Sequence, residues 1–300
     1  MVDAVASETL VPDDELKPRK FCLQVGLQPT MVLHPIRQPV TNNDDVVALL
    51  EKGLIQVDLP GLTFPIPAFT RPGFYGRQAM PREDFDLKLN QLQGEVETLA
   101  QIVAKSINRA VDALKRRDLV ASQEVINDDD YIDYKRFEIE ERCADMIATQ
   151  QPMAGDLRAI IALLHIVVEL ERMGDYAEGI AKISISMGDM PPLKPLIDIP
   201  RMAEKATVML NDSIDSLLNR DMVKANAVCQ ADDEVDELYN QVYRELLLFM
   251  VQDPETIQRA TYLLWVAHDL ERIADRATNI AERVIFLVTG KLVEINVSRY

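Results

Sequence analysis

Apolar residues after Met80 recur every three or four positions, which is the spacing of one face of an α-helix. The clearest stripe predicts one long helix and consists of Phe85, Leu89, Leu92, Val96, Leu99, Val103, Ile107, Val111 and Leu114. The same periodicity predicts helices over 119–149 and 156–187, and then over 201–219, 221–251 and 254–289. The pattern therefore predicts an all-α fold after Met80.

Residues 1–79 have a different composition, with nine of the sixteen prolines and five of the eleven glycines. Proline cannot continue a helix because it lacks the amide donor and its ring clashes with the preceding turn. We expect a Pro/Gly-rich, weakly ordered N-terminal extension with one short helix over 43–52, capped by Thr41 or Asn42. Its apolar residues leave open a docking peptide or a small pair of strands.

The six predicted helices form two repeats. Asp112 and Asp118 recur at one constant offset as Asp215 and Asp221, and the segment 169–175 (ELERMGD) matches 269–275 (DLERIAD). Each repeat is helix–helix–helix with short connections. We therefore expect two tandem three-helix bundles related by a pseudo-twofold repeat, over 80–190 and 200–295, after the extension over 1–79.

One acidic pattern, an Asp or Glu followed four residues later by Asp, occurs at four repeat-related places. The pairs are Asp129/Asp133, Glu171/Asp175, Asp232/Asp236 and Glu271/Asp275. Residues four apart share one helix face, where like charges repel by roughly a few tenths of a kcal/mol, so a cation should offset the repulsion. If the second and third helices of each bundle pack side by side, each bundle brings four carboxylates together as candidate metal ligands.

Carboxylate oxygens suit Mg²⁺, Mn²⁺, Ca²⁺ or iron, and bridging carboxylates permit clusters of several ions. We expect divalent or trivalent metal ions here, with iron, manganese, magnesium or zinc as candidates. Glu178 and Glu282 continue the same faces as outer ligands. The weaker candidates are Glu169, Asp269 and Asn279. As an alternative, the acidic faces are merely solvated, and Arg172 and Arg272 form ordinary helix salt bridges in a plain structural bundle.

A carboxylate-bridged metalloenzyme is a further alternative. The Glu-x-x-His signature of di-iron bundles is absent, because His165 stands at the wrong spacing from Glu171. We expect His268 to face away from Glu271 and Trp265 to lie in the core. The sequence has no Gly-rich phosphate loop, no GxSxG and no Cys/His couple, so no catalytic residue is predicted.

The chain is strongly acidic, with a net charge of −17 and a pI near 4.6. Such a surface repels nucleic-acid phosphates and anionic membranes, and it favours cations and basic protein surfaces. Three cysteines without a CxxC pair are typical of a reducing compartment. Because no apolar run reaches about 18 residues and no secretory leader is present, we expect a cytoplasmic protein without stable membrane insertion.

Four segments together resemble the PhoU family of bacterial phosphate-signalling regulators. They are 82–89 (REDFDLKL), 150–158 (QQPMAGDLR), 171–175 (ERMGD) and 269–282 (DLERIADRATNIAE). The resemblance covers residues 80–295 and both repeats in order. Residues 1–79 have no counterpart in the family, so they are either an added segment or Met80 is the true start.

The resemblance implies a regulatory protein and not an enzyme. It implies two three-helix bundles, a homodimer, and multinuclear metal clusters held by the four acidic pairs. It further implies coupling of the nucleotide-binding subunit of the Pst phosphate ABC transporter to a sensor histidine kinase. In that role the chain would negatively regulate phosphate uptake and the phosphate-starvation response.

Overall fold

The computed structural model describes residues 30–33, 55–58, 82–188 and 190–292 of the 300-residue chain. Two compact units are distinguished, 1–78 and 79–300. In the first, β1 (Thr30–Leu33) pairs antiparallel with β2 (Ile55–Asp58), and Thr30 lies opposite Asp58. The strand pair that the sequence left open is therefore present. The predicted helix over 43–52 and the weak order of the extension lie outside the described residues.

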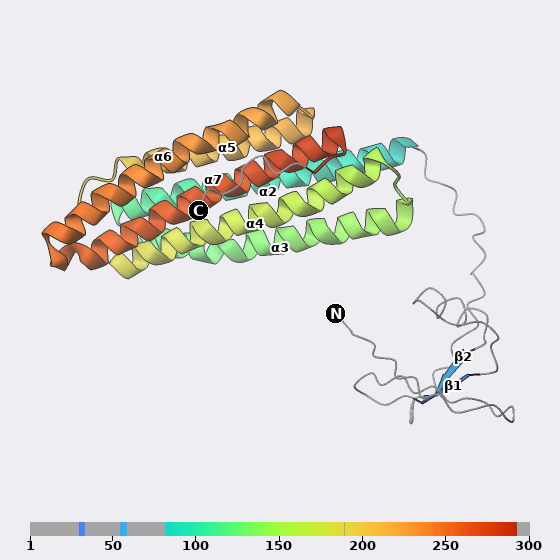
Figure 1. Ribbon diagram of the computed structural model, residues 1–300, viewed down its shortest axis with the longest axis horizontal. Coiled ribbons are helices and arrows are strands. Elements are labelled where there is room, and N and C mark those ends of the chain that lie inside the picture. Colours follow the sequence, from blue (N-terminus) through green and yellow to red (C-terminus); the bar gives the residue numbers. More distant parts are fainter. Residues whose placement is uncertain (1–29, 34–54, 59–81, 189, 293–300) are drawn as a thin grey trace, which may run out of the picture. The chain divides into compact units, whose positions relative to one another are not determined.

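Within its described residues, the second unit contains six long α-helices and one turn of 3₁₀ helix (Figure 1). Their bounds are α2 Arg82–Arg116, α3 Leu119–Gln150, α4 Gly155–Met187, α5 Asp198–Asn219, α6 Met222–Gln252, η1 Pro254–Thr256 and α7 Ile257–Thr289. The predicted all-α fold of two tandem three-helix bundles is confirmed. Among the described residues, no helix is long and apolar enough to cross a membrane.

Helix α5 begins earlier than the sequence predicts. We expected a start at residue 201, after Pro200, but the helix already begins at Asp198. Proline is tolerated in the first helical turn because the amide hydrogens there have no carbonyl partner within the helix. Pro200 therefore belongs to the first turn of α5 and does not precede it.

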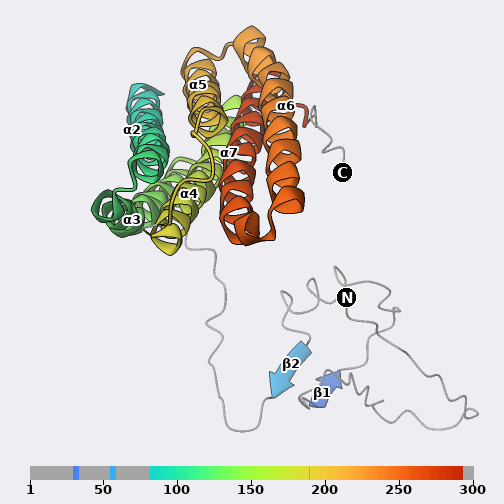
Figure 2. The ribbon, with the colours of Figure 1, turned by 90° about the vertical axis from the view of Figure 1, so that its left-hand side faces the viewer.

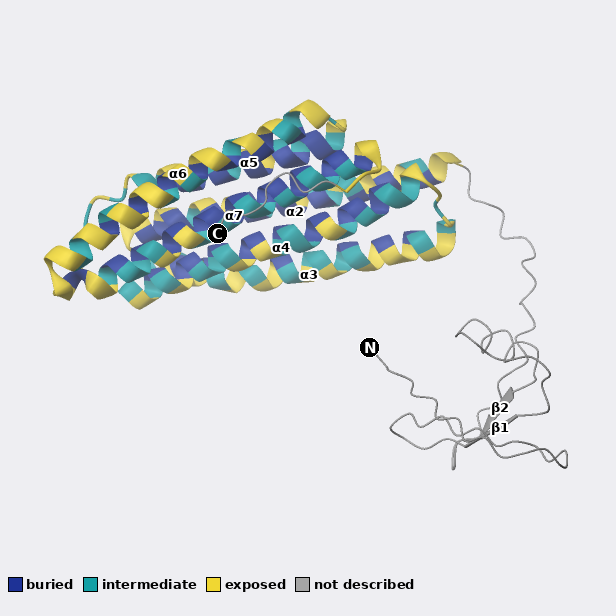
Figure 3. Cartoon of the chain, in the orientation of Figure 1, coloured by how far each residue is buried: buried dark blue, intermediate teal, exposed yellow. Residues whose placement is uncertain are grey.

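Helices α2, α3 and α4 pack together, as do α5, α6 and α7, and the end-on view separates the two groups (Figure 2). Helix α4 packs against α7, and α2 packs against α5, so the halves meet over two helix pairs. Buried side chains from all six helices form one continuous apolar cluster (Figure 3). Because this core is shared, the division into domains at 80–190 and 200–295 stays a prediction.

The core contains most of the predicted apolar positions, with one exception. All nine residues of the first stripe, from Phe85 to Leu114, are buried. Leu263 is buried as well, but Trp265 is 52% exposed, so its prediction as a core residue is wrong. The helical period explains the error, because Trp265 lies two positions after Leu263 and the two side chains therefore point to different sides of α7.

Two repeat-related aspartates cap the second helix of each half. The carboxylate of Asp118 accepts a hydrogen bond from the backbone N–H of Ala121 at 2.9 Å. The carboxylate of Asp221 accepts from Val223 N at 2.9 Å and Lys224 N at 3.0 Å. Because the first amides of a helix have no other backbone partner, these side chains fix where α3 and α6 begin.

Replacing Asp221 tests this cap. We expect Asp221→Ala to lower the free energy of unfolding by about 1 kcal/mol, because two amides at the start of α6 lose their acceptor. Asp212→Ala removes only an exposed ion pair, in which Asp212 Oδ1 lies 3.2 Å from Lys224 Nζ. This control should change the free energy of unfolding by less than about 0.5 kcal/mol. Urea denaturation followed by circular dichroism measures both. Equal losses in the two variants would contradict the capping role.

Candidate metal centres

The first acidic group lies where α3 packs against α4. Asp129 and Asp133 stand one turn apart on α3, and Glu171 and Asp175 stand one turn apart on α4. The carboxyls of Asp129, Asp133 and Glu171 are half-buried, whereas Asp175 is exposed. The two predicted pairs of the first half therefore lie on adjacent helices, at the edge between core and surface.

The pKa values show that these carboxyls share one electrostatic environment. Burial, and then the negative charges of Glu178, Asp175 and Asp133, together raise the pKa of Asp129 to about 7. Burial, followed by the charge of Asp175, also raises the pKa of Glu171. Glu178, the predicted outer residue, thus belongs to the same group. Such raised pKa values mean that the ionised forms of these carboxyls are less favourable in the folded chain than in water.

Gly174 provides the space that α3 needs at this group. A Cβ atom at Gly174 would stand 3.1 Å from Asp129 Oδ1 and 3.0 Å from the Cδ1 atom of Ile132. A side chain at this position would require Asp129 and Ile132 to shift by a few tenths of an ångström. The glycine in the motif therefore has a packing role, because it lets a carboxylate of α3 lie directly against α4.

The second acidic group lies between α6 and α7 and is more deeply buried. Asp232 on α6 is 3% exposed and Glu271 on α7 is 4% exposed. Burial and then the charges of Asp236, Asp275 and Glu271 raise the pKa of Asp232 to about 7. Burial and then the charge of Glu271 raise that of Asp236 to about 6. The repeat thus produces two related carboxylate groups that differ in depth.

His268 belongs to the second group, contrary to the prediction. Its Nδ1 atom lies 3.5 Å from Glu271 Oε2, and its ring centroid lies 6.2 Å from that of Tyr239. The prediction that His268 faces away from Glu271 is wrong, because residues three apart share a helix face. The first half has Val168 at the equivalent position, so this imidazole is a donor that repeat comparison could not reveal. His165 is exposed on α4.

Several basic residues stand beside the carboxylates. Arg136 Nη1 lies 4.0 Å from Glu171 Oε1, and Arg272 Nη1 donates to Asp275 Oδ2 at 3.1 Å. Lys182 Nζ lies 2.5 Å from Glu178 Oε2. In the part of the chain that the structure describes, no three His, Cys, Asp or Glu side chains converge as a ready-made metal site. The carboxylates therefore lie near one another, and their side chains would have to change rotamer to coordinate a common ion.

Glu169 and Asn279, two of the weaker candidates, connect the two halves. Arg276 Nη1 and Asn279 Nδ2, both on α7, donate to Glu169 Oε2 at 3.1 Å each. The equivalent of Glu169 in the second half, Asp269, lies against α4, where a Cβ at Gly179 would stand 3.2 Å from its Oδ2. These residues therefore form related contacts across the α4–α7 interface.

The donor chemistry of both groups fits a hard or borderline cation. Each supplies carboxylate oxygens from two helices, and in the second group an imidazole lies next to them. A bound cation would lower the cost of keeping the buried Asp232 and Glu271 close to other anions. The residues that would hold it in each half are the predicted pairs, so their assignment as ligands stays a prediction.

Together, the repeated three-helix fold and the paired carboxylates define a class of tandem helical-bundle proteins with acidic helix faces. The family model described as PhoU domain matches residues 96–184 and 199–284. The chain belongs to the PhoU family.

Similar proteins support this assignment. The phosphate-specific transport system accessory protein PhoU homolog of Aquifex aeolicus is 44% identical over 207 residues, covering 69% of this chain and 94% of that protein. Its namesake from Clostridium acetobutylicum is 38% identical over 218 residues, covering 72% and 100%. The crystal structure of PhoU from Pseudomonas aeruginosa matches with a TM-score of 0.66 and 34% identity, covering 69% of this chain and 100% of that one.

The raised pKa values predict a pH dependence of stability in the presence of a chelator. Folded Asp232 keeps its proton up to about pH 7, whereas its ordinary pKa is 3.8. The folded state therefore binds more protons than the unfolded state between these values, so stability falls as pH rises through this window. We expect Asp232→Asn to raise the free energy of unfolding at about pH 8 by on the order of 1 kcal/mol and to flatten the profile.

Urea denaturation at about pH 5 and about pH 8 measures this effect. Glu237→Gln, which removes an exposed carboxylate of the same helix, is the matched control and should leave the profile unchanged. A wild-type protein whose free energy of unfolding increases from about pH 5 to about pH 8 would contradict the expected cost of ionising Asp232.

Proposed function

We propose that this protein is a metal-binding regulatory adaptor of phosphate homeostasis. In this proposal, the two carboxylate groups hold divalent or trivalent ions. The protein couples the nucleotide-binding subunit of the Pst ABC transporter to a sensor histidine kinase. It acts as a homodimer and negatively regulates phosphate uptake and phosphate-starvation signalling.

Membership in the PhoU family supports the general part of this proposal. The relatives from Aquifex aeolicus and Clostridium acetobutylicum are accessory proteins of phosphate-specific transport by name. The structure from Streptococcus pneumoniae, 31% identical with a TM-score of 0.66, is that of a phosphate transport system regulatory protein. This chain accordingly has an accessory or regulatory role in phosphate transport and is not assigned an enzymatic one.

The burial of Asp232 and Glu271 beside further carboxyls is the observation that carries the metal-binding part. Burying a carboxylate is costly, and placing like charges next to it adds to the cost. A divalent or trivalent ion would neutralise the group and would join α6 to α7 through the same ligands. The first group would join α3 to α4 in the same manner. Metal binding in this proposal is therefore structural and electrostatic.

A row of exposed aromatic residues beside the first group supports partner binding. Tyr131, Tyr134 and Phe137 are 50%, 62% and 58% exposed and follow one another along α3 at intervals of three residues. Exposed aromatic side chains are enriched at protein interfaces, where they lose water on contact. The row lies on the helix that supplies Asp129 and Asp133, so a partner bound to it would contact the surface next to the first group.

Metal content tests the first part of the proposal. After incubation with iron, manganese, magnesium or zinc and removal of free ions, elemental analysis of the wild-type protein should show retained metal. Asp232→Asn/Glu271→Gln should lose the share bound by the second group, because both buried ligands lose their charge. The control Glu234→Gln/Glu237→Gln changes two exposed residues of α6 and should retain the wild-type content. A wild-type protein that retains no ion would overturn this part.

Partner binding tests the second part. The purified protein should bind the nucleotide-binding subunit or the cytoplasmic part of the kinase, measured by calorimetry. Tyr134→Ser/Phe137→Ser should weaken binding by about tenfold or more, because two interface aromatics are lost. Val208→Ser, at a residue 53% exposed on α5, is the control for an exposed apolar side chain elsewhere.

Gene deletion tests the regulatory direction. Removing the gene should raise alkaline phosphatase output at high phosphate, because the restraint on the starvation response is lost. Re-expression of the wild-type chain should restore the low output. An unchanged output after deletion would count against negative regulation, whatever the metal content shows.

A further inference from the structure

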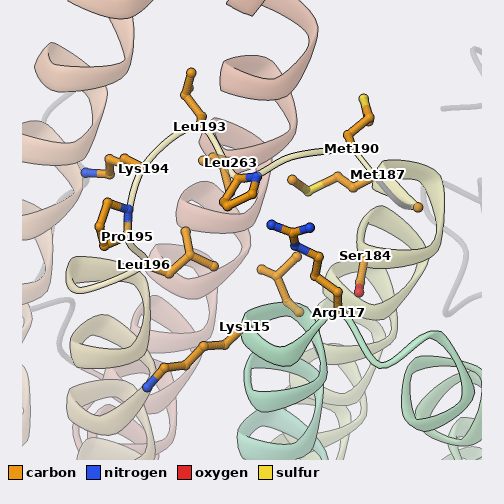
Figure 4. Close-up of a pocket in the computed structure, with 13 residues that line it drawn as sticks. Lys115, Arg117, Ser184, Met187, Met190, Leu193, Lys194, Pro195, Leu196 and Leu263 are labelled. Carbon is orange, nitrogen blue, oxygen red and sulfur yellow. The ribbon is translucent and has the colours of Figure 1, made fainter.

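A pocket lies where the chain passes from the first half to the second (Figure 4). Helices α2 and α4 end at its edge, residues 190–196 of the linker run along it, and α7 contributes Leu263. Its volume is about 200 Å³. Most of its lining is apolar and comes from leucine, methionine and proline side chains, so a bound molecule would lose water over much of its surface.

The charge of this pocket is opposite to that of the chain. The sequence contains 49 acidic and 32 basic residues. The described residues that line the pocket nevertheless include three basic side chains, those of Lys115, Arg117 and Lys194, and no acidic one. An anion entering the pocket would therefore meet a locally positive lining on an otherwise negative protein.

Only one of the three basic side chains is directed into the pocket without a protein partner. Lys194 is 8% exposed and pairs with Asp198 at 3.4 Å and with Glu245. Lys115 extends away from the cavity, whereas the Arg117 guanidinium points into it, towards Met187 and the linker (Figure 4). Among the described residues, the Arg117 side chain makes no ion pair or hydrogen bond.

Comparison of the two repeats distinguishes the backbone turn at Arg117, which both halves have, from the pocket, which lies beside only one of the two turns. Arg117 has a φ of 57°, and Arg220 has a φ of 52° at the equivalent turn of the second half. Both residues immediately precede a capping aspartate. The turn alone is therefore a repeated backbone feature that glycine would adopt with less strain. The linker occurs once in the chain, so of these two exposed arginines only Arg117 lines a pocket beside it.

We propose that this pocket binds a small organic carboxylate with an apolar body. The guanidinium presents two parallel N–H groups that match a carboxylate, at the exposed side of a largely apolar lining. The leucine and methionine side chains would cover the apolar part of the ligand. The volume suits a molecule smaller than a typical drug-sized ligand.

A singly charged ligand fits better than a phosphate dianion. The carbonyl ends of α2 and α4 point towards this region, and the partial negative charge of a helix C-terminus opposes further negative charge. One guanidinium can neutralise one carboxylate but leaves a dianion half compensated. The described residues that line the pocket include none of the four acidic pairs, so the proposed site is separate from the proposed metal sites.

Methyl NMR of the full-length protein with labelled methionines tests the proposal, because Met187 and Met190 line the pocket. Titration with 4-methylpentanoate should shift these two signals saturably, with a Kd on the order of 1 mM. Acetate, inorganic phosphate and the neutral 4-methylpentanamide should each bind at least about tenfold more weakly, because each lacks one required feature. Arg117→Gln should weaken 4-methylpentanoate binding by about tenfold or more.

Two variants guard against an effect on folding. Arg117→Gly removes the guanidinium but relieves the left-handed turn, so it should keep the fold and lose binding. Arg220→Gln makes the equivalent change outside the pocket and should bind like the wild type. Unshifted Met187 and Met190 signals, equal binding of phosphate or of the amide, or full binding by both Arg117 variants would each overturn the proposal.

Discussion

The contact between α4 and α7 is the interaction on which the rest of the molecule depends. Both helices carry an acidic motif, and both bury small residues such as Ala177 and Ala277. Small side chains let the helices approach closely, so that Glu169 reaches Arg276 and Asn279 across the interface. Helices α3 and α6 then pack against the outer sides of this pair. The position of each acidic group follows from that arrangement.

In the acidic groups, the packing of the apolar core places carboxyls where their negative charge is unfavourable. The apolar core requires α6 to lie against α7, and this brings Asp232 into a buried position beside Asp236, Asp275 and Glu271. The carboxyl responds with a pKa of about 7, since holding a proton costs less than holding a buried charge among like charges. A protein that needed only a stable bundle would gain by replacing these residues, which supports a role for them in binding cations.

The two halves have the same backbone plan but differ in chemistry. The second group is deeper than the first and has His268 beside it, while the first has Gly174 where the second has Ala274. Arg117 and Arg220 share a turn, yet only Arg117 lies against the linker. Duplication thus explains the common fold, and the places where the copies depart from each other are where separate binding properties are expected.

The helices, their order and the repeat could be predicted from the sequence, because periodicity, proline and capping aspartates act within a few residues of each other. It also identified the four acidic pairs, since a spacing of four places two side chains on one helix face. The contact of His268 with Glu271 and the side of α7 on which Trp265 lies also follow from helical spacing, although both were predicted wrongly. The depth of each acidic pair could not be predicted in this way. That depth depends on which neighbouring helix covers each face, and therefore on how α3, α4, α6 and α7 pack together. The pocket at Arg117 likewise exists only because the linker folds back over the end of α2.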